Sequence, residues 1–234
     1  IGGRFNVMAI NPVDNNIMYA GCSTGGIFKT TDGGTTWYPV FDSQPYLSIG
    51  CITLDPDDPN IIYVGTGDVN ISGYPFIGDG IYKSTDGGAN WIHLGLTNER
   101  IISEIKINPT NTQIIYAGTM GLPYVMNSER GLYKSVDGGA NWNQVLYVND
   151  STGAIDLEMD YNNPNTLYAA TWNRIRNNHQ SIWHGVDAHI YKTTDGGATW
   201  NILSNGLPTG DQCRISMSMS ALDRKSTRLN SSHR

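Results

Sequence analysis

The sequence predicts an all-β β-propeller, seen as an incomplete ring of four four-stranded blades plus the first strand of a fifth. Three observations lead to this prediction: a twelve-residue pattern occurs four times, its copies recur at a nearly constant spacing, and short alternating strands fill each interval. The aspartates at the centre of the copies are separated by 54, 51 and 58 residues. A period near fifty that holds four short strands is typical of a propeller blade.

Each repeat contains its strands in a fixed order. The first strand alternates and ends at an Asn/Asp-Pro turn, at residues 7–12, 51–56 and 104–109, whereas the fourth repeat has Tyr161 in place of the proline. The second strand carries a tyrosine, the third follows Gly-Ile-Tyr-Lys, and the fourth opens with tryptophan. We place the blades at residues 1–45, 46–98, 99–150 and 151–208. The fifth starts at 209–222, with Cys213–Met219 as its first strand.

The recurring Asp-Gly-Gly turn has a physical explanation. Glycine supplies the positive φ of a tight hairpin, and the aspartate carboxylate accepts backbone N–H groups across the turn. The tryptophan then places a large ring against the sheet. We therefore expect structural roles for these aspartates and tryptophans, with each tryptophan largely buried. They are Asp32, Trp37, Asp86, Trp91, Asp137, Trp142, Asp195 and Trp200.

The pattern Thr30-x-Asp32-x-Gly34-x-Thr36-Trp37 and its three copies resemble the Asp-box, or bacterial neuraminidase repeat. The opening Gly2-Gly3-Arg4 before a blade is most similar to bacterial sortilin-like propellers. The resemblance covers residues 1 to about 220 and implies a propeller on a secreted or cell-surface protein of a bacterium. The same repeat occurs in sialidases, in xyloglucan-cleaving glycosidases and in a photosystem assembly factor, so the fold alone does not choose a function.

Residues 223–234 resemble the translation of a sequencing-library adapter, and we interpret them as a cloning or assembly scar rather than a basic tail. Without this segment, which holds four basic residues and Asp223, the net charge of −6 becomes −9. Such an acidic chain is an unlikely partner for nucleic acid, whose phosphates bind Lys and Arg. The longest apolar runs are too short for a membrane span.

Residue types give no sign of a metal or cofactor. Cys22, Cys51 and Cys213 form no CxxC pair, and we expect them to be buried as small apolar residues. His179, His184 and His189 stand five residues apart, which is a weak metal-ligand spacing. We therefore expect no metal and no cofactor.

Strand alternation places the Asp-boxes on one face and the second-to-third loops, with the links between blades, on the other. The insertions at 66–79, 119–130 and 171–188 lie on this second face, which we call the loop face, and insertions on one face usually mark a binding face. Ordinary loops that pack on themselves remain the alternative, and Lys106 and Glu158 are expected to pair between blades. The predicted binding residues are Arg4, Asp68, Tyr74, Glu104, Arg130, Asp156, Trp172, Arg174 and His184.

These residues favour a glycan- or protein-binding module, or a scaffold, over an enzyme. The alternative is a glycoside hydrolase, which needs two carboxylates beside the scissile bond. Xyloglucan-cleaving relatives place an aspartate where this chain has Ser23, and the Arg-Ile-Pro motif of sialidases does not occur. The candidate carboxylates are Asp68, Asp79, Glu104, Glu129, Asp156 and Asp187, and their partner can lie outside these blades.

Overall fold

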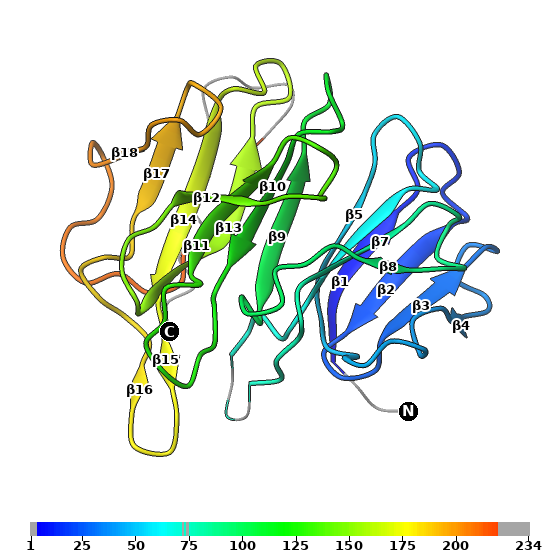
Figure 1. Ribbon diagram of the computed structural model, residues 1–234, viewed down its shortest axis with the longest axis horizontal. Helices are drawn as coiled ribbons and strands as arrows, with labels where there is room; N and C mark the ends of the chain where they lie inside the picture. The colour runs from blue at the N-terminus through cyan, green and yellow to red at the C-terminus, as the bar shows by residue number, and fades with distance from the viewer. Residues whose placement is uncertain (1–3, 72, 74, 220–234) are drawn as a thin grey trace.

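The computed structural model describes residues 4–71, 73 and 75–219, and no helix occurs in this part of the chain. Tyr74 and the segment interpreted as a scar lie outside the described residues. Within them, the strands form four four-stranded antiparallel sheets and one two-stranded hairpin (Figure 1). The prediction of an all-β propeller with four-stranded blades is confirmed.

The strands follow the predicted order in each blade. Blade one has β1 (Phe5–Ile10), β2 (Met18–Cys22), β3 (Ile27–Thr30) and β4 (Tyr38–Pro39). Blade two has β5 (Ile49–Leu54), β6 (Ile62–Thr66), β7 (Ile81–Ser84) and β8 (Ile92–His93). Blade three has β9 (Ile102–Ile107), β10 (Ile115–Thr119), β11 (Gly131–Ser135) and β12 (Asn143–Leu146). Blade four has β13 (Thr152–Met159), β14 (Leu167–Asn173), β17 (Ile190–Thr193) and β18 (Asn201–Ile202), with the hairpin β15 (Ile175–Arg176) and β16 (Ser181–Ile182) inserted.

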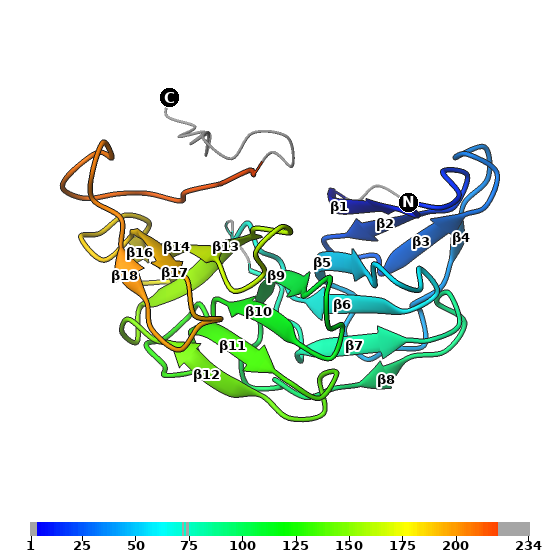
Figure 2. The ribbon, with the colours of Figure 1, turned by 90° about the horizontal axis from the view of Figure 1, so that it is seen from above.

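The blades form an arc around an open centre, as Figure 2 shows from above. The first strands β1, β5, β9 and β13 lie on the concave side, and β1 contacts β5, β5 contacts β9, and β9 contacts β13. The short fourth strands lie on the convex side. Side chains of the first strands therefore border the central opening.

The segment predicted as the first strand of a fifth blade, Cys213–Met219, has no continuous ladder of paired residues in the described part of the chain. Among the described residues, Cys213–Met219 is not part of a continuous strand, and isolated bridge residues occur at Gln212, which pairs with Gly185, and at Ser216 and Met219. An alternating pattern is not sufficient for a strand, because the backbone N–H and C=O groups of the segment must pair with a neighbouring strand. The segment is instead held by side-chain contacts of Arg214 and Asp156, described below.

The apolar cores lie between the blades. One cluster joins Tyr19 and Ile27 of blade one to Ile52 and Ile62 of blade two, and similar clusters join the later pairs. A glycine near the end of the second strand permits this close approach, since a Cβ at Gly65 would lie 2.5 Å from the Ile102 side chain. Cys22 and Cys51 are buried as expected, and Cys213 is half-buried.

The Asp-box turns have the predicted hydrogen bonds. In blade three, the Asn141 N–H donates to Asp137 Oδ1 at 2.9 Å and the Ser135 hydroxyl donates to the same oxygen at 2.8 Å. The N–H of Gly139 donates to Ser135 Oγ at 2.8 Å. Hydrogen bonds from Asn141 and Ser135 lower the pKa of Asp137 to about 2. The Asp-box aspartates are therefore occupied in holding their hairpins.

The tryptophans connect successive blades, but they are not all buried. Trp91 donates its indole N–H to the Val40 carbonyl of blade one at 2.8 Å, and Trp142 donates to the Leu94 carbonyl of blade two at 3.0 Å. Trp37 is 37% exposed and donates within its own turn. The prediction that each tryptophan is largely buried is wrong for Trp37, because the described chain has no blade before it for this ring to contact.

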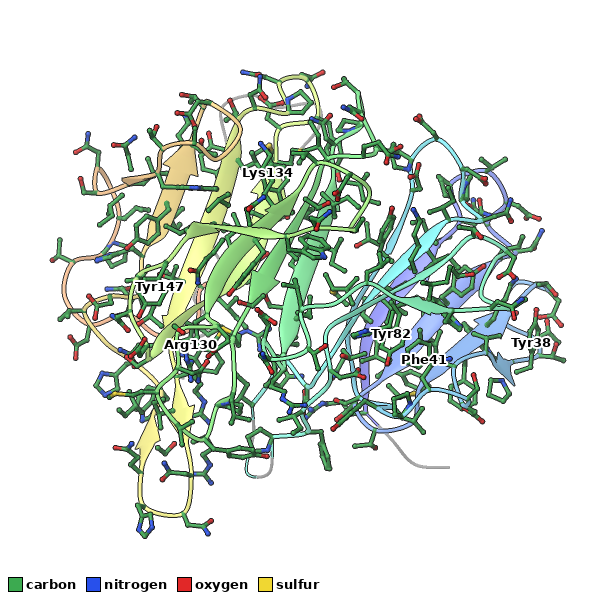
Figure 3. The ribbon with its side chains drawn as sticks, viewed as in Figure 1. Tyr38, Phe41, Tyr82, Arg130, Lys134 and Tyr147 are labelled. Atoms are coloured by element: carbon green, nitrogen blue, oxygen red, sulfur yellow. The ribbon has the colours of Figure 1, made fainter. Side chains whose placement is uncertain are left out.

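A second connection between blades was not foreseen from the sequence. Tyr19 and Lys29 of blade one both donate to the carbonyl of Gly87, in the Asp-box of blade two, at 3.2 and 2.8 Å. Tyr116 and Lys134 hold the Gly196 carbonyl of blade four in the same way (Figure 3 labels Lys134). Tyr and Lys of blades one and three thus bind the Asp-box glycine of the next blade, and we call this contact the glycine clamp; among the described residues of blade two, only Tyr63 reaches the corresponding carbonyl, that of Gly138, at 3.4 Å.

Candidate binding face

The loop face is built from the segments that follow β6, β10 and β14, together with the links between blades. Its longest projection is the β15–β16 hairpin, which extends beyond the other strands at the bottom of Figure 1. The backbone N–H of Arg176 in this hairpin donates to the Pro123 carbonyl of the blade-three loop at 2.7 Å. The loops of neighbouring blades therefore support one another.

Arg4 and Asp68, predicted as separate binding residues, meet in an ion pair between blades one and two. The Asp68 side chain is fully buried and accepts further hydrogen bonds from Asn6 Nδ2 at 3.3 Å, the Asn70 N–H at 3.1 Å and Ser23 Oγ at 3.4 Å. All of its oxygens thus have donors, so this carboxylate is engaged in joining the blades.

This geometry bears on the position where xyloglucan-cleaving relatives carry an acid. Ser23 occupies that position and is itself buried, and the neighbouring carboxylate is supplied by Asp68 of the next blade. A general acid or base must reach the proton that it transfers. Asp68 is ion-paired and has no exposed surface, so it does not meet that requirement in this arrangement.

Asp156 on β13 holds the segment that follows blade four. Its Oδ2 accepts the Met217 N–H at 2.7 Å and the Ser216 hydroxyl at 3.0 Å. Arg214 then reaches back to Asn70 Oδ1 of blade two at 3.0 Å. Residues 214–217 therefore connect blade four to blade two beside the central opening.

Glu104 borders the same opening on β9. Lys106 lies 3.5 Å from Glu104 and 3.6 Å from Glu158 on β13, which confirms the predicted pairing of Lys106 with Glu158. Withdrawal from water raises the pKa of Glu104 to about 7, with Lys106 opposing the shift and Asp156 and Glu158 adding to it. At neutral pH a substantial fraction of the Glu104 carboxyl groups therefore carries a proton, as a general acid requires.

Trp172 and Arg174 lie together, but both are buried. Trp172 is 7% exposed, donates its indole N–H to the Trp183 carbonyl at 2.8 Å and stacks against the Arg174 guanidinium at 5.4 Å. Arg174 donates to the Ile71 carbonyl of blade two at 2.5 Å and to the Ile182 carbonyl at 2.9 Å. Both side chains therefore support the loops, although Arg174 Nε is buried without a hydrogen-bond partner among the described residues.

Arg130 has no exposed surface and serves a similar purpose (Figure 3). Burial lowers the pKa of Arg130 to about 10, which leaves it charged at neutral pH. Its guanidinium donates to four backbone carbonyls of the blade-three and blade-four loops, those of Leu122, Val125, Ser151 and Arg174. A cation in this position fixes the loops by satisfying their carbonyls.

The remaining predicted residues are dispersed. His184 is exposed, lies 3.0 Å from Asp211 and packs edge-on against Trp183. Asp187 accepts Asn149 Nδ2 at 2.9 Å, and the buried Asp79 accepts the Tyr82 hydroxyl at 2.8 Å. The structure thus joins Arg4 to Asp68 and Trp172 to Arg174, and it leaves His184 apart.

Two hollows open on the loop face, one on each side of Pro75. The first, about 430 Å³, is lined by Tyr46, Phe76 and neighbouring residues. The second, about 650 Å³, is lined by Tyr124, Arg176 and two asparagines. Tyr46 was missed by sequence reasoning because it lies in a link between blades, where we assigned no function. Phe76, Tyr124 and Arg176 lie in insertions that the sequence did mark.

Fold and site together define an Asp-box β-propeller with an elaborated loop face. Residues 79–229 match the model of the Sortilin–Vps10 family, described as sortilin, neurotensin receptor 3, and the chain belongs to this family.

Curated relatives match a larger part of the chain. The xyloglucanase Xgh74A of Acetivibrio thermocellus is 27% identical over 233 residues, which cover 89% of this chain and 26% of the relative. A xyloglucanase of Paenibacillus sp is 25% identical, covering 89% and 22%. The chain therefore spans about a quarter of the length of these relatives.

Solved structures agree on the fold. An ancestral GH74 enzyme superposes with a TM-score of 0.72 at 20% identity, covering 92% of this chain and 27% of that one. In the part of the chain that the structure describes, no helix is long and apolar enough to cross a membrane.

Proposed function

We propose that the loop face of this propeller binds a polysaccharide without cleaving it. The observation that carries this proposal is the pair of hollows that share Pro75 and carry Tyr46, Phe76 and Tyr124 along their walls. Sugar rings present apolar C–H faces that stack on aromatic side chains, and open surface hollows leave room for a chain that continues past them. The two hollows together suit an extended chain better than a single small molecule.

The relatives support a glycan rather than a peptide as the ligand class. Their names record xyloglucanases, which act on a polysaccharide. A polysaccharide ligand also agrees with a location outside the cell or on its surface, which the Asp-box resemblance implies. A peptide or protein ligand, and a purely structural scaffold, are the competing possibilities.

The state of the carboxylates argues against cleavage by these blades alone. Hydrolysis of a glycosidic bond requires an acid and a second carboxylate on either side of it. Asp68 and Asp156 are fully engaged in contacts that hold the blades and the following segment. Asp79 is buried against Tyr82.

A glycoside hydrolase is the second candidate, and Glu104 is the observation that favours it. Its pKa of about 7 is suited to a general acid at neutral pH, and it borders the central opening. Glu104 and Glu158 both contact Lys106, which holds them near each other. In this second reading Glu104 donates the proton, and a carboxylate from this cluster or from outside these blades completes the pair.

The test combines binding with product analysis on the full chain. Isothermal titration with xyloglucan oligosaccharides and with peptides of matched length distinguishes the ligand classes, and reducing-end assays detect cleavage. We expect glycan binding without new reducing ends. Binding of the peptides alone contradicts the proposal, and release of reducing ends that Glu104→Gln abolishes establishes the hydrolase.

A further inference from the structure

The larger hollow of the loop face contains an arginine whose charge the fold does not use. Arg176 is fixed through its backbone, which pairs with Ser181 across the β15–β16 hairpin and donates to the Pro123 carbonyl at 2.7 Å. Its side chain lines the hollow of about 650 Å³. Among the described residues, no ion pair involves Arg176.

Two neighbouring arginines, in contrast, use their guanidinium groups inside the fold. Arg130 and Arg174 are buried and donate their guanidinium groups to backbone carbonyls of the loops. Burial first, and then the charge of Arg176, lowers the pKa of Arg174, which places Arg176 close to this second cation. Arg176 is the one charged side chain among the described residues that line the hollow, so the hollow is locally positive on a chain whose net charge is −6.

The other walls of the hollow offer an aromatic ring and side-chain amides, which are groups that contact sugar rings. Tyr124 donates its hydroxyl to the Pro75 carbonyl of blade two at 2.6 Å, and Asn177 Nδ2 donates to the Tyr124 carbonyl at 2.8 Å. These bonds tie the loops of blades two, three and four around the aromatic ring. Asn178 is exposed and adds an amide to the rim, and none of the described wall residues carries a carboxylate.

We infer that this hollow binds a uronic acid residue of an acidic polysaccharide, with the sugar carboxylate on Arg176 and the sugar ring against Tyr124. The planar guanidinium fits a carboxylate through two parallel hydrogen bonds, which a neutral sugar does not supply. The inference rests on the proposed function and narrows its ligand from polysaccharides in general to acidic ones. An acidic peptide has the same charge but lacks a ring face for Tyr124.

The experiment compares oligogalacturonate with xyloglucan oligosaccharides of matched length by isothermal titration on the full chain. We expect the acidic oligosaccharide to bind at least about tenfold more tightly at low salt and to lose this advantage as salt rises. Arg176→Gln should remove the preference, lowering the affinity for the acidic oligosaccharide at least about tenfold more than the affinity for xyloglucan. Arg176→Lys should retain part of it, because a point charge replaces a fork of two donors.

Lys192→Gln is the matched control, since it removes one positive charge beside the Tyr168 ring, one residue before an Asp-box. Thermal melts of each variant establish that it is folded. Equal affinity for the two glycans overturns the inference and leaves the proposed function standing. Binding of neither glycan overturns the proposed function itself. Arg176-dependent binding of poly-glutamate at equal or greater affinity overturns the inference in favour of an acidic peptide.

Discussion

Tyr116 donates its hydroxyl to the carbonyl of Gly196 at 2.9 Å, across 80 residues of sequence and from one blade to the next. Lys134 donates to the same carbonyl at 2.7 Å. The glycine clamp therefore joins the strands of one blade to the Asp-box turn of its neighbour. The same pair of donors, Tyr19 and Lys29, holds Gly87 between blades one and two, so the contact recurs with the repeat and stabilises these two blade boundaries.

Tyr116→Phe removes one donor of the clamp and keeps the ring. We expect the free energy of unfolding to fall by about 0.5–1.5 kcal/mol, the usual net value of a buried hydrogen bond. Urea denaturation measures it. Tyr63→Phe is the matched control, because its hydroxyl lies 3.4 Å from the Gly138 carbonyl and so contributes less. An equal loss of unfolding free energy in the two variants would show that the Tyr116 hydroxyl does not stabilise the fold through this hydrogen bond.

The Asp-box tryptophans should differ in their contribution to stability. Trp142→Ala removes a ring that packs on blade two and donates to Leu94, and we expect a loss of about 2–3 kcal/mol. Trp37→Ala removes a ring that is 37% exposed, and we expect less than about 1 kcal/mol. Chemical denaturation of both variants measures the difference, and a larger loss for Trp37 would contradict the role assigned to blade contact.

The Asp-box carboxylates should make stability depend on acid. Hydrogen bonds from Asn90 lower the pKa of Asp86 to about 2 from its ordinary 3.8, and Asp137 behaves in the same way. A carboxyl whose folded pKa is depressed stabilises the fold above its unfolded pKa, and this contribution is lost as pH falls from about 4 to about 2. Melting temperatures across that range should drop.

Asp137→Asn removes one of these titrations, so its melting temperature should be lower at neutral pH and fall less steeply in acid. Asp57→Asn, at an exposed turn residue, serves as the control. An identical acid dependence in Asp137→Asn and the unaltered chain would refute the assignment.

Arg130→Met tests the support of the loops. The substitution leaves the carbonyls that Arg130 now binds without a buried donor, and we expect a loss of about 3 kcal/mol or more. Hydrogen exchange should increase in the loop of residues 120–127 and in the β15–β16 hairpin. Unchanged hydrogen exchange in both segments would mean that the loops keep their structure without Arg130.

The local features of this fold could be predicted from sequence, because each depends on a few adjacent residues. The Asp-box is such a feature: its glycines, its aspartate and its Ser or Thr all act within one hairpin. The pairing of Lys106 with Glu158 could also be predicted from the sequence, since the strand order places them on neighbouring first strands.

Features that depend on loop packing could not be predicted. Arg130 and Trp172 have residue types common at binding surfaces, but the loops of blades three and four fold over them. Likewise, alternation in Cys213–Met219 does not reveal that this segment has isolated bridges in place of a continuous strand in the described part of the chain. In the same way, no short pattern reveals that Tyr46 and Phe76 share a hollow.

Polysaccharide binding by the loop face is tested most directly by Phe76→Ala. Phe76 is 46% exposed in the smaller hollow, and its backbone is anchored by the Asp68 N–H at 2.7 Å, so the loop should keep its place when the ring is removed. Tyr38→Ala is the control, since Tyr38 is a similarly exposed aromatic residue on β4 (Figure 3). The measurement is the dissociation constant of a xyloglucan oligosaccharide by titration calorimetry. We predict that Phe76→Ala weakens binding about tenfold, as expected for an aromatic anchor, while Tyr38→Ala leaves it unchanged. Unaltered affinity in Phe76→Ala, or an equal loss in Tyr38→Ala, would contradict a binding site on this face.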